Sequence, residues 1–287
     1  MLQLLRSRSR ARLRPLRSSE RAMALGLCER NPVETVMIHA RLQASQVARE
    51  PNIIAAFDRE GQLVGLCLNE ANIIPWNIPE DLRLKLAKIL QKRKGRVNSL
   101  VGPARDVLPI WELLKKSGWK AFDERPKQLL MQYFESPQQE QTLVRVRQAQ
   151  AKDFPEVFPA AVEMFFAELG YDPTASGDAY YQHVHQLIRN RRTFIREQNL
   201  LTGKKLVFKA DIGTQSTTVA QIQGVWTHPD FRGQGIATAS MREIARYIRK
   251  DSGREVSLYV NDYNFGAIQA YLRAGFRTVG EFSTILL

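Results

Sequence analysis

The stretch "TVAQIQGVWTHPDFRGQGIATASM" (218–241) changes character twice within 24 residues. Apolar and polar residues alternate over 218–227, which predicts a β-strand. After Pro229, an Arg and two glycines, apolar residues recur with helical spacing over 235–250, which predicts a helix. The stretch therefore predicts a strand, a Gly-rich loop and a helix in direct succession.

The loop at 232–238 has the residue types that suit an anion. Its two glycines permit backbone angles closed to other residues and keep side chains away from a ligand. The helix that follows begins with unpaired N–H groups and a partial positive charge, and Arg232 adds a forked, permanent cation. We therefore expect a phosphate cradle, the alternative being a Gly-rich turn without a ligand.

Two other phosphate motifs fit this loop less well. A Walker A loop needs a Gly-Lys-Ser/Thr triplet, which does not follow here. The dinucleotide fingerprint would place Thr238 where Gly or Ala is needed.

The rest of the chain alternates short apolar strands with amphipathic helices, which indicates an α/β fold with a mixed sheet. In the carboxyl-terminal half, the expected strands are 143–150, 193–197, 204–213, 255–260 and a closing pair within 276–287, and the expected helices are 152–170, 178–190 and 264–274. In the amino-terminal half, the expected elements are a strand at 12–16, helices at 18–29 and 32–45, a hairpin of 52–58 with 62–69, a helix at 79–94, a strand at 98–102, a helix at 106–116 and a final strand region.

The two halves show a similar order of elements and are separated by the polar segment "ESPQQEQT" (135–142). In addition, "LLKKSGWKAF" (113–122) echoes "AYLRAGFRTV" (270–279). We therefore expect a first domain at 1–136, a linker at 137–142 and a second domain at 143–287. The echoes favour an internal duplication, with the first domain as a degenerate copy.

The net charge of +13 is unevenly distributed, because residues 1–136 contain 24 Lys and Arg against 14 Asp and Glu. The first 21 residues alone hold seven Arg and one Glu. Such a start is typical of a transit peptide, of a nucleic-acid-binding arm or of a basic tail that leads into a first strand, and we expect the tail.

Cysteine and histidine usage indicates the compartment and argues against a metal. Two cysteines, Cys28 and Cys67, do not form a disulfide scaffold or a zinc site, and they favour a reducing, cytoplasmic location. His183 and His185 are two positions apart on a predicted helix, so they do not share a face and no metal is expected. No run of about 18 apolar residues occurs, so neither a membrane span nor a membrane partner is expected. The sequence indicates no particular oligomeric state.

The loop also resembles a family motif. Residues 232–237 match the Q/R-x-x-G-x-G/A pattern of the GCN5-related N-acetyltransferases (GNAT), and "SLYVNDYNFGAIQAYLRAGF" (257–276) resembles the last strand–helix–strand segment of that superfamily. The resemblance covers roughly 143–287. The whole chain also looks like actinobacterial two-domain acetyltransferases with an uncharacterised amino-terminal domain. It implies a GNAT fold, with acetyl-CoA as cosubstrate.

The resemblance implies a set of cofactor-binding positions. The backbone of 232–238 would hold the pyrophosphate, and 225–227 would pair with the pantetheine arm where the fourth strand of the fold splays from the fifth. The residues expected to bind acetyl-CoA are Val225, Trp226, Thr227, Arg232, Gly233, Gln234, Gly235, Ile236, Ala237, Thr238, Asn261 and Asn264.

Acyl transfer to an amine needs a neutral amine and a proton for the leaving thiolate. Tyr271 is the expected general acid, because a phenol with a pKa of about 10 stays protonated at neutral pH. The alternative is an ordinary core Tyr on an amphipathic helix. Asn264 is expected to cap the helix that carries Tyr271.

The general base is left open by the sequence. The predicted strand 218–227 offers two Gln side chains, at 221 and 223, and no carboxylate. The remaining candidates are His228, Glu168 or Asp172 acting through water, and a water chain without a dedicated base.

The amino-terminal copy is expected to bind no acetyl-CoA. Its phosphate-loop position falls at "IIPWNIPEDL" (73–82), which has no glycine and no Arg before the helix, and Leu114 stands where Tyr271 stands in the second copy. We expect this copy to brace the transferase or to shape the acceptor cleft, with its charge suited to an acidic or anionic partner.

We expect an N-acetyltransferase that moves the acetyl group of acetyl-CoA to a primary amine of a small molecule or protein. The first alternative is an aminoacyl-tRNA-dependent transferase of tandem GNAT fold, since "QKRKGR" (91–96) and the Arg-rich start keep RNA contact open. The second is a non-catalytic acyl-CoA-binding scaffold. The phosphate-binding motif favours the acetyltransferase.

Overall fold

The computed structural model describes residues 11–44, 52–135, 145–175, 177–201 and 203–287. The chain divides into unit 1, with Met1–Leu130 and Gly280–Leu287, and unit 2, with Met131–Val279. The expected linker at 137–142 lies outside the described residues, and the expected domain ranges remain predictions. None of the described helices combines the length and the apolar character that a membrane crossing would need.

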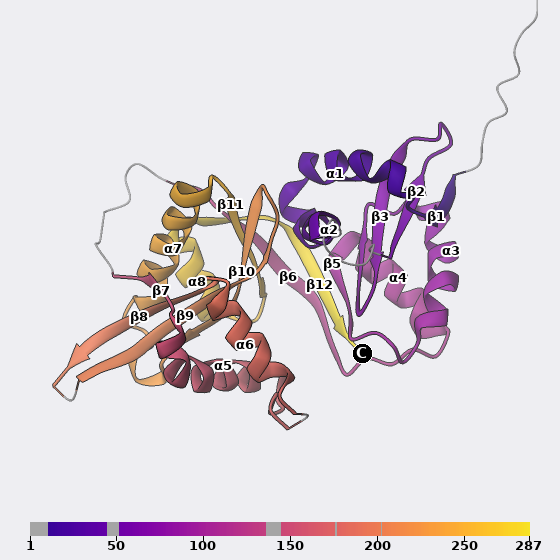
Figure 1. Cartoon of the computed structure of the whole chain (residues 1–287). Coiled ribbons are helices and arrows are strands. Elements are labelled where there is room, and N and C mark those ends of the chain that lie inside the picture. The colour runs from indigo at the N-terminus through magenta and orange to yellow at the C-terminus, as the bar shows by residue number, and fades with distance from the viewer. Residues whose placement is uncertain (1–10, 45–51, 136–144, 176, 202) are drawn as a thin grey trace, which may run out of the picture. The chain divides into compact units, whose positions relative to one another are not determined.

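Unit 1 is a mixed sheet with helices on both faces (Figure 1). Its strands follow the order β1-β2-β3-β4-β5-β12, and only β4 and β5 are parallel. The strands are β1 (Arg12–Pro15), β2 (Ile53–Phe57), β3 (Leu63–Asn69), β4 (Asn72–Trp76), β5 (Ser99–Pro103) and β6 (Asp123–Tyr133), with the end of β12 (Phe276–Leu286). The helices are α1 (Arg21–Arg30), α2 (Pro32–Ala44), α3 (Glu80–Leu90) and α4 (Ala104–Lys116).

Two apolar clusters hold unit 1 together, one on each face of its sheet. The first packs α3 and α4 against the strands and includes Leu86, Trp111 and Leu114. The second packs α1 and α2 against the other face and includes Ile38 and Leu42. Because each strand side chain faces one of two helix layers, the strands are apolar on both sides, as the near-continuous burial of β2 and β3 shows.

Unit 2 repeats this plan. Its strands follow the order β6-β11-β10-β9-β8-β7, with β10 and β11 parallel and the pairs from β7 to β10 antiparallel. The strands are β7 (Arg147–Gln148), β8 (Thr193–Leu200), β9 (Gly203–Gln215), β10 (Val219–Thr227) and β11 (Glu255–Asn261). The helices are α5 (Phe154–Leu169), α6 (Ala179–Arg189), α7 (Ile236–Ser252) and α8 (Phe265–Ala274).

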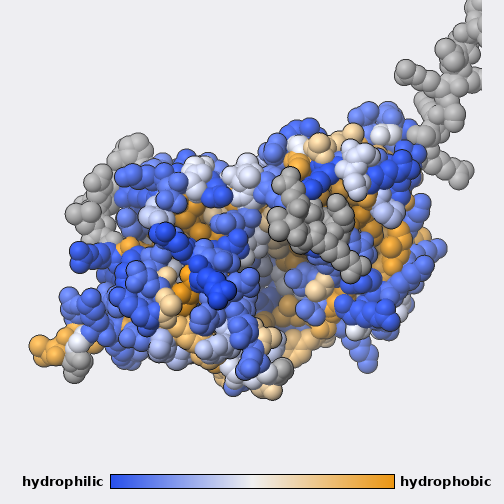
Figure 2. All heavy atoms as spheres, viewed as in Figure 1, coloured by the Kyte–Doolittle hydropathy of each residue, from blue (hydrophilic) through white to orange (hydrophobic). Residues whose placement is uncertain are grey.

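Aromatic side chains dominate the contact between α5 and α6. Phe154 and Phe158 stack with ring centroids 5.3 Å apart, and Phe165 lies 5.0 Å from Tyr180. Beyond this layer the β8–β9 hairpin ends in exposed Leu200 and Leu201, where Figure 2 shows hydrophobic spheres at the tip of unit 2. The apolar spacing that predicted α5 thus serves packing between two helices as well as packing on the sheet.

The element order confirms the duplicated fold class. A strand, two helices, three strands, a helix, a strand, a helix and a strand occur in the series β1 to β6, and again in β7 to β12. The two parallel pairs, β4 with β5 and β10 with β11, fall at the same place in each series.

Three details differ from the expected elements. The strand expected at 143–150 is described only as the two-residue β7, and 143–144 lie outside the described residues. The closing strand pair is wrong: 276–286 form one strand, because Gly280 does not adopt a positive φ and the chain does not turn. The loop expected within 73–82 is shorter, since 72–76 belong to β4, which pairs with both β3 and β5.

A salt-bridge network ties β7 to its neighbours and makes stability depend on acid. The Arg147 guanidinium lies 2.6 Å from Asp153 and 2.8 Å from Glu197, and its hydrogen bonds hold the pKa of Asp153 below the ordinary value. A lowered folded-state pKa means that the stabilisation is present above the unfolded pKa of about 4 and is lost as pH falls through the folded one.

We predict that Arg147→Met lowers the free energy of unfolding by about 1 kcal/mol near pH 7, because the pair is partly exposed. Below the lowered pKa of Asp153 the variant and the parent protein should converge. Urea unfolding followed by circular dichroism across pH 2–7 measures both limits. An equal difference at every pH would contradict the assignment.

Candidate functional site

The central feature of unit 2 is the divergence of its two parallel strands. Pairing between β10 and β11 covers only Val219–Gln221 with Glu255–Ser257, although β10 continues to Thr227 and β11 to Asn261. At the last pair, Nε2 of Gln221 and Oγ of Ser257 are buried without a hydrogen-bond partner among the described residues. The divergence therefore leaves the inner edges of both strands unpaired and begins at two unsatisfied polar groups.

A β-bulge in β10 accompanies this divergence. Gln223 pairs with Asp211 and Trp226 with Lys209, so two residues of β10 stand opposite the single residue Ala210. The extra residue gives β10 a local bend, as bulges do. Gly224 lies in the bulge with φ +58°, a conformation that favours glycine.

A buried ion pair holds the bulge in place. The Lys209 side chain is 1% exposed, and its Nζ donates to Asp211 Oδ2 at 2.6 Å and to the Gly224 carbonyl at 3.1 Å. Thr193 Oγ1 donates to the other Asp211 oxygen at 2.7 Å. A Cβ on Gly224 would lie 2.7 Å from Asp211 Oδ2, so this position requires glycine for space as well as for backbone angle.

The loop after β10 is open at both of its glycines. Gly233 and Gly235 adopt φ of +77° and +74°, and nothing lies within 4 Å of a Cβ built on either one. Helix α7 begins directly at Ile236, with Gly235 as its N-cap and no side chain capping it. The first amides of α7, at 236–238, therefore point out of the helix start without intrahelical partners.

Arg232 lies at the mouth of this loop and is 59% exposed. Its Nε donates to the Thr227 carbonyl at 3.0 Å, and its guanidinium lies 3.7 Å from Glu163 of α5. Gln234 donates to the Asp230 carbonyl. The hydrogen bond to Thr227 thus holds the Arg232 guanidinium near the start of α7, while most of the guanidinium stays accessible.

The predicted helix cap on the other side is confirmed. The Asn264 side chain accepts a hydrogen bond from the Ala267 amide at 3.2 Å, and the Asn264 amide donates to the Asn261 carbonyl at the end of β11. About two turns further along α8, Tyr271 is 7% exposed and its ring lies 6.1 Å from that of Phe276. Asn261, Asn264 and Tyr271 therefore follow one another along a single strand-to-helix segment.

The environment of Tyr271 keeps its hydroxyl protonated. Burial raises the pKa of the phenol, and the negative charge of Glu168 raises it further. Burial also raises the pKa of Tyr180, followed by the charges of Asp211 and Glu168. Glu168, at the end of α5, thus acts electrostatically on tyrosines from both α6 and α8, a link that the sequence alone did not reveal.

The other base candidates are engaged in local structure. His228 caps the turn Pro229–Phe231 by accepting the Asp230 amide on Nδ1 at 3.3 Å. Asp172 accepts both the amide and the hydroxyl of Thr174. Gln223 donates to Gln221 at 3.4 Å.

The described residues contain no group of three or more His, Cys, Asp or Glu side chains that could hold a metal.

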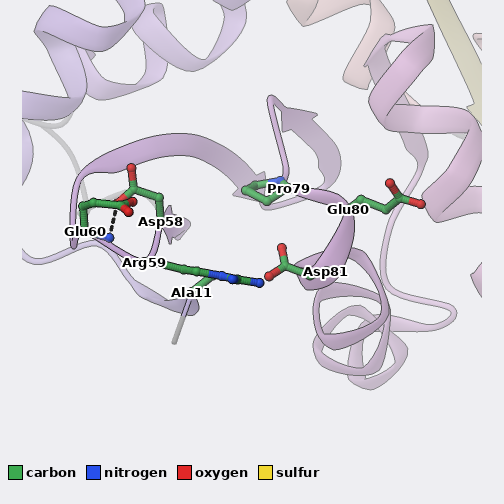
Figure 3. A pocket seen from close by; sticks show the side chains of 7 residues that line it. All are labelled: Ala11, Asp58, Arg59, Glu60, Pro79, Glu80 and Asp81. Atoms are coloured by element: carbon green, nitrogen blue, oxygen red, sulfur yellow. Dashed lines mark hydrogen bonds between the residues drawn. The ribbon is translucent and has the colours of Figure 1, made fainter. Parts of the chain in front are cut away.

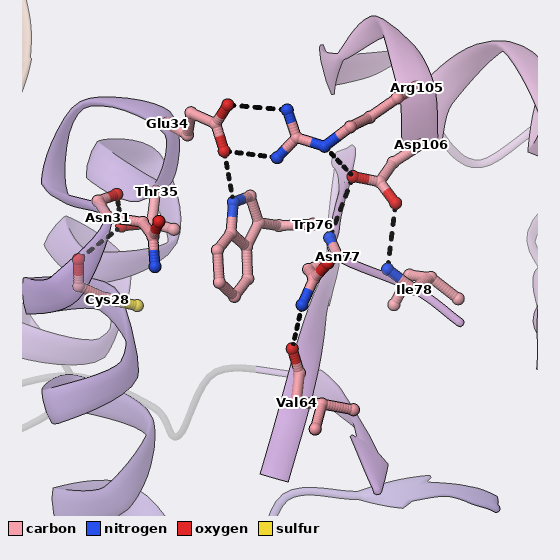
Figure 4. Close-up of polar contacts among 10 residues, drawn as sticks. All are labelled: Cys28, Asn31, Glu34, Thr35, Val64, Trp76, Asn77, Ile78, Arg105 and Asp106. Atoms are coloured by element: carbon pink, nitrogen blue, oxygen red, sulfur yellow. Dashed lines mark hydrogen bonds and ion pairs between the residues drawn. The ribbon is translucent and has the colours of Figure 1, made fainter. Parts of the chain in front are cut away.

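In unit 1 two amides of the loop before α3 are bound by a carboxylate of the chain itself. Asp106 is buried at the start of α4, and it accepts the amides of Asn77 and Ile78, each at 2.9 Å (Figure 4). These amides precede α3, as the glycine loop precedes α7. In addition, Glu34 accepts two hydrogen bonds from Arg105 and one from the Trp76 indole.

Unit 1 also has an open depression of about 500 Å³, whose lining does not include Asn77, Ile78 or Asp106. Figure 3 shows the side chains of Arg59 and Asp81 pointing toward each other across it. Asp58 at its rim is used by the hairpin turn, because its Oδ1 accepts the amides of Glu60 and Gln62. The depression contains none of the predicted site residues.

Two family models match the chain. The acetyltransferase (GNAT) family matches residues 143–276, and a domain of unknown function (DUF4081) matches 53–157. An uncharacterized N-acetyltransferase of Methanocaldococcus jannaschii is 45% identical over 58 residues, which are 20% of this chain and 26% of that protein. The matched segment thus spans about a quarter of the length of that relative.

Three solved structures are similar over 96% of the chain: a GNAT-family acetyltransferase of Colwellia psychrerythraea (TM-score 0.54, 15% identity, 99% of that chain), a GCN5-related N-acetyltransferase of Sphaerobacter thermophilus (0.60, 15%, 94%) and a tandem GNAT protein from the clavulanic acid biosynthesis pathway (0.51, 12%, 98%). At these identities the likeness shows the fold. Residues 143–276 thus match the GNAT family model, and the chain as a whole has the fold of tandem GNAT proteins. The resemblance to the actinobacterial type stays a prediction.

We predict that Gly235→Ala folds and loses about 1–2 kcal/mol of stability, because a Cβ meets open space but a left-handed φ is costly for alanine. Gly224→Ala should lose more, since its Cβ adds a steric conflict with Asp211 to the same backbone cost. Urea unfolding of both variants measures the difference. Equal losses would contradict the account of the bulge.

Proposed function

We propose that the protein is an N-acetyltransferase that transfers the acetyl group of acetyl-CoA to a primary amine of a small molecule or a protein. The observation that carries this proposal is the loop at 232–238, where two left-handed glycines open the start of α7 beside the divergence of β10 and β11. The family match over 143–276 supports it.

The residues of this loop fit the group that they would hold. A diphosphate needs several converging N–H donors, a positive helix start and no side chain in the way, and 233–238 provide all three. Val225, Trp226 and Thr227 would offer the unpaired edge of β10 to the pantetheine arm, and Asn261 and Asn264 would bound the cleft on the side of β11. When bound, acetyl-CoA supplies an activated acetyl thioester.

We assign Tyr271 as the general acid that gives its hydroxyl proton to the departing sulfur. A phenol is protonated at neutral pH, so Tyr271 has a proton to give when negative charge develops on the sulfur. For the amine, whose own proton must leave, Glu168 offers the carboxylate that acts on Tyr271 and Tyr180. We propose that Glu168 attracts the acceptor ammonium and that water carries the proton to solvent or to this carboxylate.

We predict that Tyr271→Phe lowers kcat by about 10²–10⁴-fold, because the leaving sulfur loses its proton donor. The affinity for acetyl-CoA should change little, since phenylalanine fills the same buried space. Steady-state kinetics on an amine panel measures kcat, and titration calorimetry measures the affinity. An unchanged kcat would remove Tyr271 from the mechanism.

Unit 1 is proposed to bind no acetyl-CoA. In place of an open cradle it has Asp106 on the amides of Asn77 and Ile78, and a carboxylate there repels a diphosphate. A Cβ on Gly102 of β5 would lie 3.1 Å from the Pro75 carbonyl of β4, so these two strands approach each other closely. We propose that this copy supports the transferase or shapes its acceptor cleft.

We therefore predict one acetyl-CoA per chain in calorimetry. Gly235→Asp should abolish this binding, because the carboxylate adds bulk and like charge at the diphosphate position, and the unfolding temperature should fall only slightly. Two equivalents per chain would contradict the role proposed for unit 1. Tight, salt-sensitive tRNA binding without any acetyl-CoA binding would favour the aminoacyl-tRNA alternative.

A further inference from the structure

A second polar cavity of about 290 Å³ lies in unit 2, at the end of α7 opposite the phosphate loop. Three arginines converge on it: Arg191 and Arg192 from the turn before β8, and Arg254 from the turn before β11. Tyr247 and Asp251 of α7 line it as well. We call it the triple-arginine pocket.

Two of the three arginines, Arg191 and Arg254, donate to neutral partners. Among the described residues, none of the three lies within 4.0 Å of a carboxylate oxygen, although Asp251 shares the pocket wall. The Nε of Arg191 donates to the side-chain oxygen of Gln148 at 2.8 Å, and the Nε of Arg254 donates to the Ser216 carbonyl at 2.7 Å. Three positive charges thus face one negative charge, and the outer guanidinium nitrogens are left for other partners.

The charge of Arg192 is not compensated inside the protein. Burial lowers the pKa of its guanidinium, and the like charge of Arg254 lowers it further. Placing a half-buried cation beside a second cation costs free energy unless a counter-charge is present. An anion in the pocket would provide that counter-charge.

The backbone at Arg191 adds an independent observation. Its φ is +56°, one of two positive values found for residues other than glycine in the described chain. Arg191 follows the end of α6, where glycine is the usual residue, so an arginine there carries a backbone cost. That cost is understandable if the side chain itself is needed, and its Nε bond to Gln148 orients the guanidinium at the rim of the pocket.

The pocket is separate from the acetyl-CoA cleft. Helix α7 has 17 residues and is therefore about 25 Å long. The glycine loop precedes its first residue, while Tyr247 and Asp251 lie in its last two turns. One bound diphosphate cannot occupy both ends of the helix.

We propose that the triple-arginine pocket is a second anion site, which binds a phosphate group of a small molecule through Arg191, Arg192 and Arg254. Guanidinium groups match phosphate oxygens with paired, charge-assisted hydrogen bonds. The volume suits one phosphate group with a small substituent. This inference does not depend on the acetyltransferase proposal, because the pocket shares no residue with the cleft.

The test uses inorganic phosphate as the probe, titrated into the full chain at constant ionic strength maintained with chloride. Saturable binding by calorimetry, with a rise in unfolding temperature, is the expected result. The double variant Arg192→Gln/Arg254→Gln should weaken the phosphate affinity by at least about tenfold, since two charged hydrogen-bond donors are lost. Arg192→Lys should retain more affinity than Arg192→Gln, because it keeps the charge.

Arg196→Gln is the matched control, because Arg196 is also a half-buried arginine of unit 2 whose pKa burial lowers, and it lies outside the pocket lining. It should leave the phosphate affinity unchanged. Absence of saturable phosphate binding, or an equal loss in Arg196→Gln, overturns the proposal. Binding of an RNA duplex without binding of inorganic phosphate overturns it too, in favour of a nucleic-acid surface. Circular dichroism of each variant confirms that it is folded.

Discussion

The contact between the Lys209 ammonium and the Gly224 carbonyl sets the geometry of the whole site in unit 2. An unbulged β10 would lack the local bend that accompanies its divergence from β11. The Lys209–Asp211 pair holds this bulge, which follows the last residue of β10 that pairs with β11, Gln221. The Lys209–Asp211 pair is buried, and Thr193 donates a further hydrogen bond to Asp211. These hydrogen bonds offset the desolvation of the two charges in the protein interior.

The two copies show how one fold gives opposite outcomes at the same place. Before α7 the chain uses two glycines and leaves the helix start open. Before α3 it uses Asn77 and Ile78, and Asp106 accepts their amides. A helix start attracts negative charge in either case. In unit 1 that charge belongs to the chain, and in unit 2 we propose that it comes from a ligand.

Sequence patterns were sufficient for most of the elements, the fold class, the glycines of the loop and the cap at Asn264, because these depend on local spacing and on glycine. Strand β4 (Asn72–Trp76) was missed. The ion pair that holds the bulge was not predictable from the sequence. Lys209 and Asp211 look like an ordinary polar pair in a strand, and their role depends on β10 lying beside them. The influence of Glu168 on Tyr271 and Tyr180 also depends on three distant segments meeting. The region 276–286 forms one strand in place of the expected pair, because the chain does not turn at Gly280.

The division of the chain into units does not coincide with the polar segment between its halves. Unit 1 is completed by the last eight residues of the protein, and unit 2 takes in the residues from Met131 onward, before the polar segment at 135–142. A cut in that segment would therefore separate unit 1 from the last residues of β12 and unit 2 from the last residues of β6. Each half of the chain, divided at that segment, therefore supplies residues to both units.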